Sequence, residues 1–280
     1  MALPGMDGPA GRELEEAARE VSPWIVALAR LGFLAKALLY ATIGVLAAQA
    51  ALGRGGRTTD LGGALREVVR APMGEVMLLV IAAGLAAYAV WRVVDAVVDA
   101  EGRGGDLKGV ARRIGSALRG LAHAGLALAA FRLATHSSGG GGRDSDHYVA
   151  EAMDLAGGAW LVWVAAGAVL IYGGYQLYRA YAAKLGRQLN LGALSAGTSR
   201  WVTAISRAGI AARGIVFGLI GVLLARSASQ RDPEQAGGIR ESLELLAGMG
   251  RWPLVAVAVG LVAYAVYELL NARYRRIRVT

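Results

Sequence analysis

The segment RAGIAARGIVF, residues 207–217, is one of three copies of a single pattern in this chain. The other two copies are RLGFLAKALLY at residues 30–40 and RIGSALRGLAH at residues 113–123. All three follow R-x-G-x-x-x-[KR]-small-x-x-[YHF], and an apolar run continues after each copy. A pattern that returns along a chain indicates one supersecondary unit used repeatedly. We therefore expect three tandem repeats.

The composition indicates that lipid surrounds these repeats. Hydrophobic residues make up 55% of the chain and charged residues only 18%, whereas soluble domains average about 25% charged residues. Glycine occurs 40 times, which is typical of membrane helices that approach one another closely. The net charge of +9 favours contact with anionic lipid at one membrane face over contact with nucleic acid. The chain has no cysteine, which excludes disulfides, thiolate metal sites and cysteine nucleophiles.

Six apolar segments are long enough to span a bilayer, which takes about 20 helical residues. We expect them at about residues 24–52, 74–98, 110–134, 159–179, 203–225 and 253–271. Ser22 and Pro23 predict the start of the first segment, because proline suits the first turn of a helix. A separate short acidic helix is expected before it, at residues 14–21. The fold class predicted is an all-α integral membrane protein with six transmembrane helices.

These helices pair into repeats. We expect a cytoplasmic N-terminal segment at residues 1–23, repeat 1 at 24–100, repeat 2 at 107–182, an amphipathic linker at 183–202, repeat 3 at 203–275 and a basic tail at 276–280. Each repeat contains two spans, so the repeats run parallel to one another. The simplest arrangement is a pseudo-threefold axis along the membrane normal, and a linear array is the alternative.

The distribution of lysine and arginine predicts the orientation. Basic residues are more numerous in the links on the side of the two termini than in the links on the other side. Because cytoplasmic links carry the excess of basic residues, both termini are expected in the cytoplasm. The expected location is the bacterial cytoplasmic membrane, with the chain crossing it several times.

Each copy of the pattern holds two basic residues with different expected roles. The first position, which we term the outer arginines, is occupied by Arg30, Arg113 and Arg207. The second position, which we term the inner cations, is occupied by Lys36, Arg119 and Arg213. Each inner cation follows the pattern glycine by four residues and shares its helix face, whereas each outer arginine points nearly the opposite way, toward headgroups. A cation at the centre of a membrane helix costs about 2.5–3.5 kcal/mol on the insertion scale, and less toward the ends.

Two interpretations of these cations stay open. They are either packing and snorkelling positions set by the repeat, or a binding site for an anion or a lipid headgroup. His123 stands where the other copies have an aromatic residue, so it is a candidate proton or polar site, with a packed polar group as the alternative. His136 and His147 lie near acidic residues, but their spacing matches no known metal site.

No motif for nucleotide binding, zinc peptidase chemistry or serine hydrolysis is present. We therefore expect no enzyme, no cofactor and no metal. The leading interpretation is a non-catalytic scaffold or accessory membrane protein that recognises anionic lipid and not nucleic acid, with a homo-oligomer or a membrane protein as a further possible partner. The alternative is a small-solute or ion transporter or channel built from three parallel repeats. The two differ in whether the inner cations and His123 face a common hydrated cavity or lipid.

The third repeat contains five motifs: Arg207-x-Gly209-x-x-x-Arg213-Gly214, Asp232-Pro233, Gly237-Gly238, Gly260-x-x-x-Tyr264 and Ala272-Arg273-Tyr274. Together these motifs resemble the bacterial family DUF1206. The resemblance extends from about Trp24 onward and implies a six-span membrane protein with a thrice-repeated two-helix unit. Lys36-Ala37 and His123 depart from the pattern in the first and second copies. The family name denotes unknown function, so the resemblance supplies no catalytic residues.

Overall fold

The computed structural model describes residues 9–98, 104–135, 145–154, 158–182, 189 and 195–275. Within these ranges the regular elements are helices, apart from one isolated bridge between Leu189 and Arg275. The long helices are α1 (Pro9–Ala51), α3 (Gly74–Val98), α4 (Leu107–Thr135), α6 (Gly158–Ala182), α7 (Ala196–Gln230) and α9 (Arg251–Tyr274). The short ones are α2 (Leu61–Val69), α5 (Ser145–Met153), η3 (Pro233–Gln235) and α8 (Ile239–Gly248). Each of the six long helices contains a segment long and apolar enough to cross a membrane, which confirms the predicted fold class.

The first helix begins earlier than predicted. α1 starts at Pro9 and runs through Ser22 and Pro23, so the segment expected as a separate acidic helix is its first part. Pro23 removes a single backbone donor, and the surrounding alanine, glutamate and arginine residues favour a continuous helix. Residues 1–8, the tail at 276–280 and most of the linker expected at 183–202 lie outside the described residues, as does the link that contains His136.

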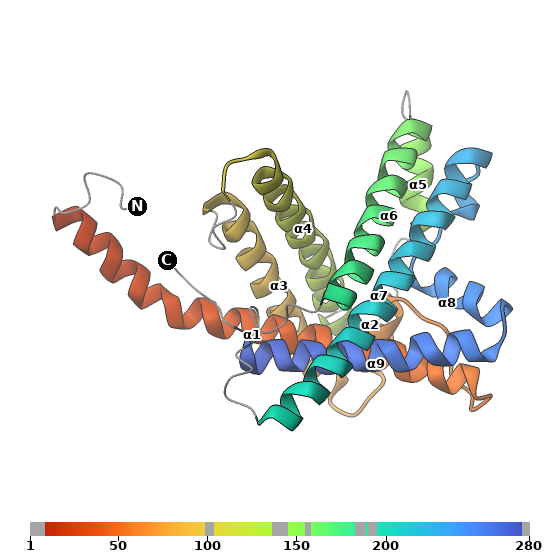
Figure 1. Cartoon of the computed structure of the whole chain (residues 1–280), viewed down its shortest axis with the longest axis horizontal. Coiled ribbons are helices and arrows are strands. Elements are labelled where there is room, and N and C mark those ends of the chain that lie inside the picture. The colour runs from red at the N-terminus through yellow and green to blue at the C-terminus, as the bar shows by residue number, and fades with distance from the viewer. Residues whose placement is uncertain are drawn as a thin grey trace.

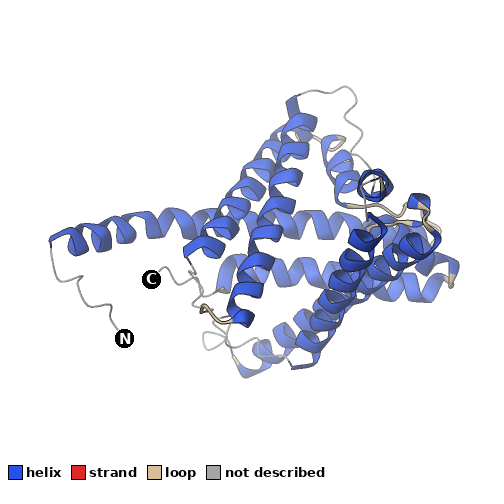
Figure 2. Ribbon diagram, turned by 90° about the horizontal axis from the view of Figure 1, so that it is seen from above, coloured by secondary structure: helices blue, strands red, loops and turns tan. Residues whose placement is uncertain are grey.

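The long helices form a ring whose order follows the repeats. Between repeats, α3 packs against α4, α6 packs against α7, and α9 returns to pack against α1 (Figure 1). Within repeats, α1 packs against α3 and α7 packs against α9. Seen from above, the three pairs between repeats run in three different directions (Figure 2). The three helix pairs between repeats are thus equivalent, as a pseudo-threefold arrangement requires.

Repeat 2 is the exception in this ring. Both α4 and α6 lie entirely within the described residues, yet they lack the extended packing that joins the two helices of repeats 1 and 3. In Figure 1 the α3–α4 pair and the α6–α7 pair diverge from each other above α1 and α9. The ring is therefore open on one side, between α4 and α6.

Glycines make the contacts within repeats 1 and 3 close. A Cβ atom on Gly32 would lie 2.5 Å from Tyr88 Cβ, and one on Gly84 would lie 2.9 Å from the carbonyl oxygen of Leu31. In repeat 3, a Cβ on Gly209 would overlap the backbone of Tyr264 in the same way. Only glycine fits where two helices approach this closely.

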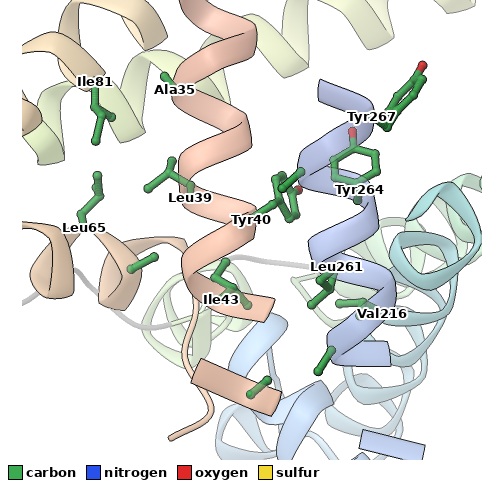
Figure 3. Close-up of a cluster of buried hydrophobic side chains, with 14 of the residues drawn as sticks. Ala35, Leu39, Tyr40, Ile43, Leu65, Ile81, Val216, Leu261, Tyr264 and Tyr267 are labelled. Atoms are coloured by element: carbon green, nitrogen blue, oxygen red, sulfur yellow. The ribbon is translucent and has the colours of Figure 1, made fainter. Parts of the chain in front are cut away.

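The apolar core lies at the crossing of α1 with α9 and is closed at one end by short helices. Leu39 and Ile43 of α1 lie between Leu65 of α2 and Leu261 of α9 (Figure 3). Asp60 starts α2, since its carboxylate accepts a hydrogen bond from the Gly63 amide at 2.6 Å. This packing holds the inner cation of α1 against α9.

Candidate functional site

The outer arginines bind the end of the neighbouring helix. Arg113 donates to the carbonyl oxygens of Ala96 and Val97, both at 2.7 Å, in the last turn of α3. Arg207 donates to the carbonyl oxygens of Ala180 and Tyr181, at 2.8 and 2.7 Å, in the last turn of α6. The last carbonyls of a helix have no partner within the helix, and the planar guanidinium reaches two at once.

This arrangement differs from the expectation that the outer arginines reach toward headgroups. Arg113 and Arg207 join one repeat to the next at equivalent places, whereas Arg30 is exposed.

Lys36 forms a buried ion pair between repeats 1 and 3. Its Nζ atom lies 2.7 Å from Oε1 of Glu268 on α9, and both side chains are buried. The ammonium also lies over the rings of Tyr88, at 5.0 Å, and Phe33, at 5.6 Å. Aromatic faces attract cations, and the attraction is stronger away from water. This inner cation therefore has a carboxylate and two aromatic partners.

Arg213 lies among aromatic side chains from all three repeats. It donates to the hydroxyl oxygens of Tyr40 and Tyr172, each at 3.0 Å. Its guanidinium carbon lies 4.8 Å from the centre of the Phe217 ring and 5.0 Å from that of Tyr264. Among the salt bridges of the described residues none involves Arg213. Its charge is thus held by hydroxyls and rings.

Arg119 and His123 occupy the equivalent positions on α4, beside the open side of the ring. Arg119 is half-buried and donates to the carbonyl oxygen of Gly115, at 2.8 Å, on its own helix. His123 Nδ1 lies 2.7 Å from the carbonyl oxygen of Arg119. A carbonyl oxygen only accepts, so Nδ1 carries the hydrogen and Nε2 of the neutral ring is an acceptor. The His123 ring packs against Tyr88, with 4.7 Å between the ring centres.

Residues of the three pattern copies meet around shared aromatic side chains. The Tyr88 ring lies 5.0 Å from the Lys36 ammonium and 4.7 Å from the His123 ring. Tyr40, one turn after Lys36, accepts a hydrogen bond from Arg213 at 3.0 Å. The sequence predicted that each inner cation shares a face with its pattern glycine, and the ring brings these faces together.

A set of buried polar residues on the second helix of each repeat was not predicted from the sequence. The residue four positions after the repeated tyrosine is Arg92 in repeat 1, Gln176 in repeat 2 and Glu268 in repeat 3, and all three are buried. None of the three is among the candidate site residues expected from the sequence. Their common offset from Tyr88 and Tyr264 is the signal that places them on the interior face.

A second set of polar residues follows three positions later. It consists of Asp95, Arg179 and Asn271. Asp95 accepts a hydrogen bond from Ser116 of α4 at 2.7 Å and lies 3.5 Å from Arg92. Arg179 donates to the Tyr267 hydroxyl at 3.3 Å, which links repeat 2 to repeat 3. The Ser116–Asp95 contact joins α4 to α3, as Arg113 does, whereas the Arg179–Tyr267 contact joins α6 to α9.

We term the nine residues of these three sets the polar layer. They are Lys36, Arg119, Arg213, Arg92, Gln176, Glu268, Asp95, Arg179 and Asn271. Five of the nine are cationic and two are carboxylates, so the layer carries an excess of three positive charges. The described grooves lie elsewhere: one of about 260 Å³ is an apolar groove between α3 and α4, and one of about 380 Å³ is lined by Arg57, Glu244 and Arg251.

A ring of long apolar helices built from three copies of one two-helix unit defines a multi-pass membrane protein with internal repeats. The chain belongs to the family described as Domain of Unknown Function (DUF1206), which it matches over residues 31–99, 114–183 and 208–275. This confirms the resemblance expected from the sequence.

A curated relative is the uncharacterized protein YxxB of Bacillus subtilis (strain 168). It is 29% identical over 266 residues, which cover 94% of this chain and 96% of the relative. No solved structure matches the chain.

Proposed function

We propose that this protein is a non-catalytic scaffold or accessory protein of the bacterial cytoplasmic membrane that recognises the anionic headgroup of a membrane lipid. The observation that supports this proposal is the excess positive charge of the polar layer, where five cations accompany two carboxylates. A charge at membrane depth is unfavourable unless an opposite charge, a hydrogen-bonding group or an aromatic ring surrounds it. An anion supplied by a ligand would offset part of this excess.

The three inner cations are not equivalent for this purpose. Glu268 already neutralises Lys36, whereas Arg213 relies on hydroxyls and rings and Arg119 is half-buried next to the open side of the ring. Arginine presents a planar set of donors that matches the oxygens of a phosphate group. Arg119 and Arg213 are therefore the residues that we assign to the headgroup, and His123 contributes a polar wall.

The orientation proposed from the basic links supports the same ligand. With both termini in the cytoplasm, the polar layer lies toward the cytoplasmic face, where anionic lipids attract basic groups. Arg119 follows the outer Arg113 by six residues, or about 9 Å along the helix. This depth is within reach of a headgroup that sinks below the interface.

Transport is the second candidate, because three parallel repeats also occur in transporters. Lys36 and Arg213 are packed among aromatic rings. This packing favours recognition over a continuous path. Solute flux in proteoliposomes that is lost in Arg213→Ala, with folding intact, would reverse this preference.

The test is lipid retention by the detergent-solubilised protein, measured by mass spectrometry of the intact protein. Phosphatidylglycerol and phosphatidylcholine of equal chain length are offered at equal concentration. We expect the wild type to retain phosphatidylglycerol preferentially, and Arg119→Gln to weaken that retention by about tenfold, which corresponds to one charged contact of about 1.4 kcal/mol. Arg132→Gln is the matched control, because Arg132 lies exposed on the same helix, about two and a half turns beyond His123. Equal retention of both lipids by the wild type would contradict the proposal.

A further inference from the structure

We infer that an anionic phospholipid enters the ring between α4 and α6 and holds these two helices apart. This inference rests on the proposed recognition of an anionic headgroup and names the place and the consequence of binding. It is carried by a comparison of equivalent positions in the three repeats, which share one pattern but differ in what covers them.

The two helices of repeat 1 cross closely, as do those of repeat 3, whereas the equivalent positions of repeat 2 do not meet. Gly32 and Gly84 meet the facing helix of repeat 1, and Gly209 meets that of repeat 3. The equivalent of Gly32 and Gly209 in repeat 2 is Gly115, and a Cβ added there would have no described neighbour within 4 Å. The facing position on α6 is Ala168, which is exposed. Repeat 2 therefore retains the small residues of a close crossing without making that crossing.

The same comparison identifies the surface that is uncovered on α4. Ala35 of repeat 1 and Ala212 of repeat 3 are both 5% exposed, whereas the equivalent Leu118 is 62% exposed. Leu39 and Val216 are buried, whereas the equivalent Ala122 is exposed. Leu118 and Ala122, on one side of Arg119, thus face away from any described helix.

On α6 the difference between repeats is equally clear. Trp91 and Tyr267 are buried at 8% and 3% exposure, whereas the equivalent Tyr175 is 54% exposed. Ala87 is 6% exposed, and the equivalent Ile171 is 75% exposed. We term the apolar surface formed by Leu118, Ala122, Ala165, Ala168, Ile171 and Tyr175 the repeat 2 opening.

The inner boundary of the repeat 2 opening is cationic. Arg119 and His123 lie on α4 next to Leu118 and Ala122, and Tyr172 lies on α6 next to Ile171. Tyr172 accepts a hydrogen bond from Arg213 at 3.0 Å. Apolar walls with a basic floor, in a chain that crosses the membrane several times, fit an acyl chain with an anionic headgroup. A neutral lipid would match the walls but not the floor.

The absence of cysteine from the chain allows a direct test in full-length protein. The pair Gly115→Cys and Ala168→Cys places thiols at the uncovered crossing, where neither substitution meets a described neighbour. The pair is oxidised in nanodiscs of pure phosphatidylcholine and in nanodiscs that contain phosphatidylglycerol. We expect disulfide formation in phosphatidylcholine, where the helices close, and a rate about tenfold lower with phosphatidylglycerol. Arg119→Gln should abolish this difference in rate between the two lipids.

Two controls separate lipid wedging from other effects. The pair Val93→Cys and Leu121→Cys lies in the apolar groove between α3 and α4, which stay packed, so its oxidation should not depend on the lipid. Inorganic phosphate added to phosphatidylcholine nanodiscs supplies the anion without the acyl chains. Slower oxidation with phosphate alone would show that a free anion, and not a lipid, separates the helices, and would overturn the inference.

The remaining outcomes distinguish this inference from the proposed function. If mass spectrometry shows retained phosphatidylglycerol but oxidation of the 115–168 pair is equal in both lipids, the inference falls and lipid recognition stands. If the pair does not oxidise in either lipid, closure does not occur and the inference also falls. If phosphatidylglycerol is not retained at all, the proposed function falls first.

Discussion

At the scale of single residues, Lys36 and Glu268 show how this protein keeps charge within a membrane. Their ion pair, 2.7 Å long, joins α1 to α9 and is surrounded by Tyr88 and Phe33. A buried pair is not strongly stabilising by itself, but removing one partner leaves an uncompensated buried charge. Lys36 is thus stable in its position because of Glu268, which lies 232 residues later in the chain.

Glu268→Gln tests this dependence. We expect a loss of about 3–5 kcal/mol in the free energy of unfolding, because Lys36 keeps its charge without its carboxylate. The matched control is Glu67→Gln, since Glu67 pairs with Arg70 at the surface, and that change should cost less than about 1 kcal/mol. Denaturant unfolding in detergent micelles, followed by far-ultraviolet circular dichroism, measures both.

A third variant separates loss of charge pairing from loss of packing. Lys36→Met combined with Glu268→Leu removes both charges and keeps apolar volume, so its stability should approach that of the wild type or exceed it. If the double variant is as unstable as Glu268→Gln alone, the ion pair is not the cause of the loss.

At the scale of helices, two kinds of contact recur in the repeats, but not every repeat makes both. The outer arginines make the same pair of carbonyl contacts from Arg113 to α3 and from Arg207 to α6. The pattern glycines make a close crossing in repeats 1 and 3, while Gly115 has no described neighbour within 4 Å. Repeat 2 therefore makes the arginine contacts with its neighbouring repeats but lacks the close crossing of its own two helices.

Equivalent glycine substitutions should have opposite effects in these two settings. Gly209→Ala should destabilise the protein by about 1–3 kcal/mol, because the new methyl group would overlap the Tyr264 backbone and force α7 from α9. Gly115→Ala should be neutral or stabilising by up to about 1 kcal/mol, since alanine favours a helix and the new methyl group meets no described residue within 4 Å. Thermal unfolding of the two variants in the same detergent gives the comparison. Equal destabilisation by both would mean that α4 and α6 cross closely in the populated state.

At the scale of the whole molecule, three parallel units form a ring, open between α4 and α6, because the last helix returns to pack against the first. α9 packs against α1 as α3 packs against α4 and as α6 packs against α7. α1, the first helix, and α9, the last, lie side by side (Figure 1). With six spans, the two termini are expected on one side of the membrane.

Reporter fusions test the proposed orientation. A fluorescent protein that folds only in the cytoplasm, fused after Thr280, should be fluorescent in bacterial cells. The same protein inserted after Arg231, in the link between α7 and η3, should be dark, because this link lies at the opposite end of the ring. The reverse pattern would place the polar layer toward the outer face and remove the argument from cytoplasmic anionic lipid.

Local patterns in the sequence were sufficient to predict the elements and the repeat. Length and hydropathy predicted six spans, and the offset of four from Gly32, Gly115 and Gly209 placed each inner cation on the glycine face. These features depend on neighbours within a few turns of one helix, so they can be deduced without knowing the fold. The start of α1 was wrong because one proline does not end a helix when the residues around it favour helix.

Partners across the ring depended on the tertiary arrangement. The offset of Glu268 from Tyr264 marks a face, but only the return of α9 to α1 brings it to Lys36. The opening of repeat 2 is also invisible in the pattern, because Gly115 and Ala168 remain as small as the residues that cross closely elsewhere. Small residues permit close approach without enforcing it, and the packing of α4 on α3 and of α6 on α7 determines where these helices lie. The segment at residues 207–217 therefore encodes a helix, its glycine face and its cation, while the neighbours of that cation follow from how the other helices pack around α7.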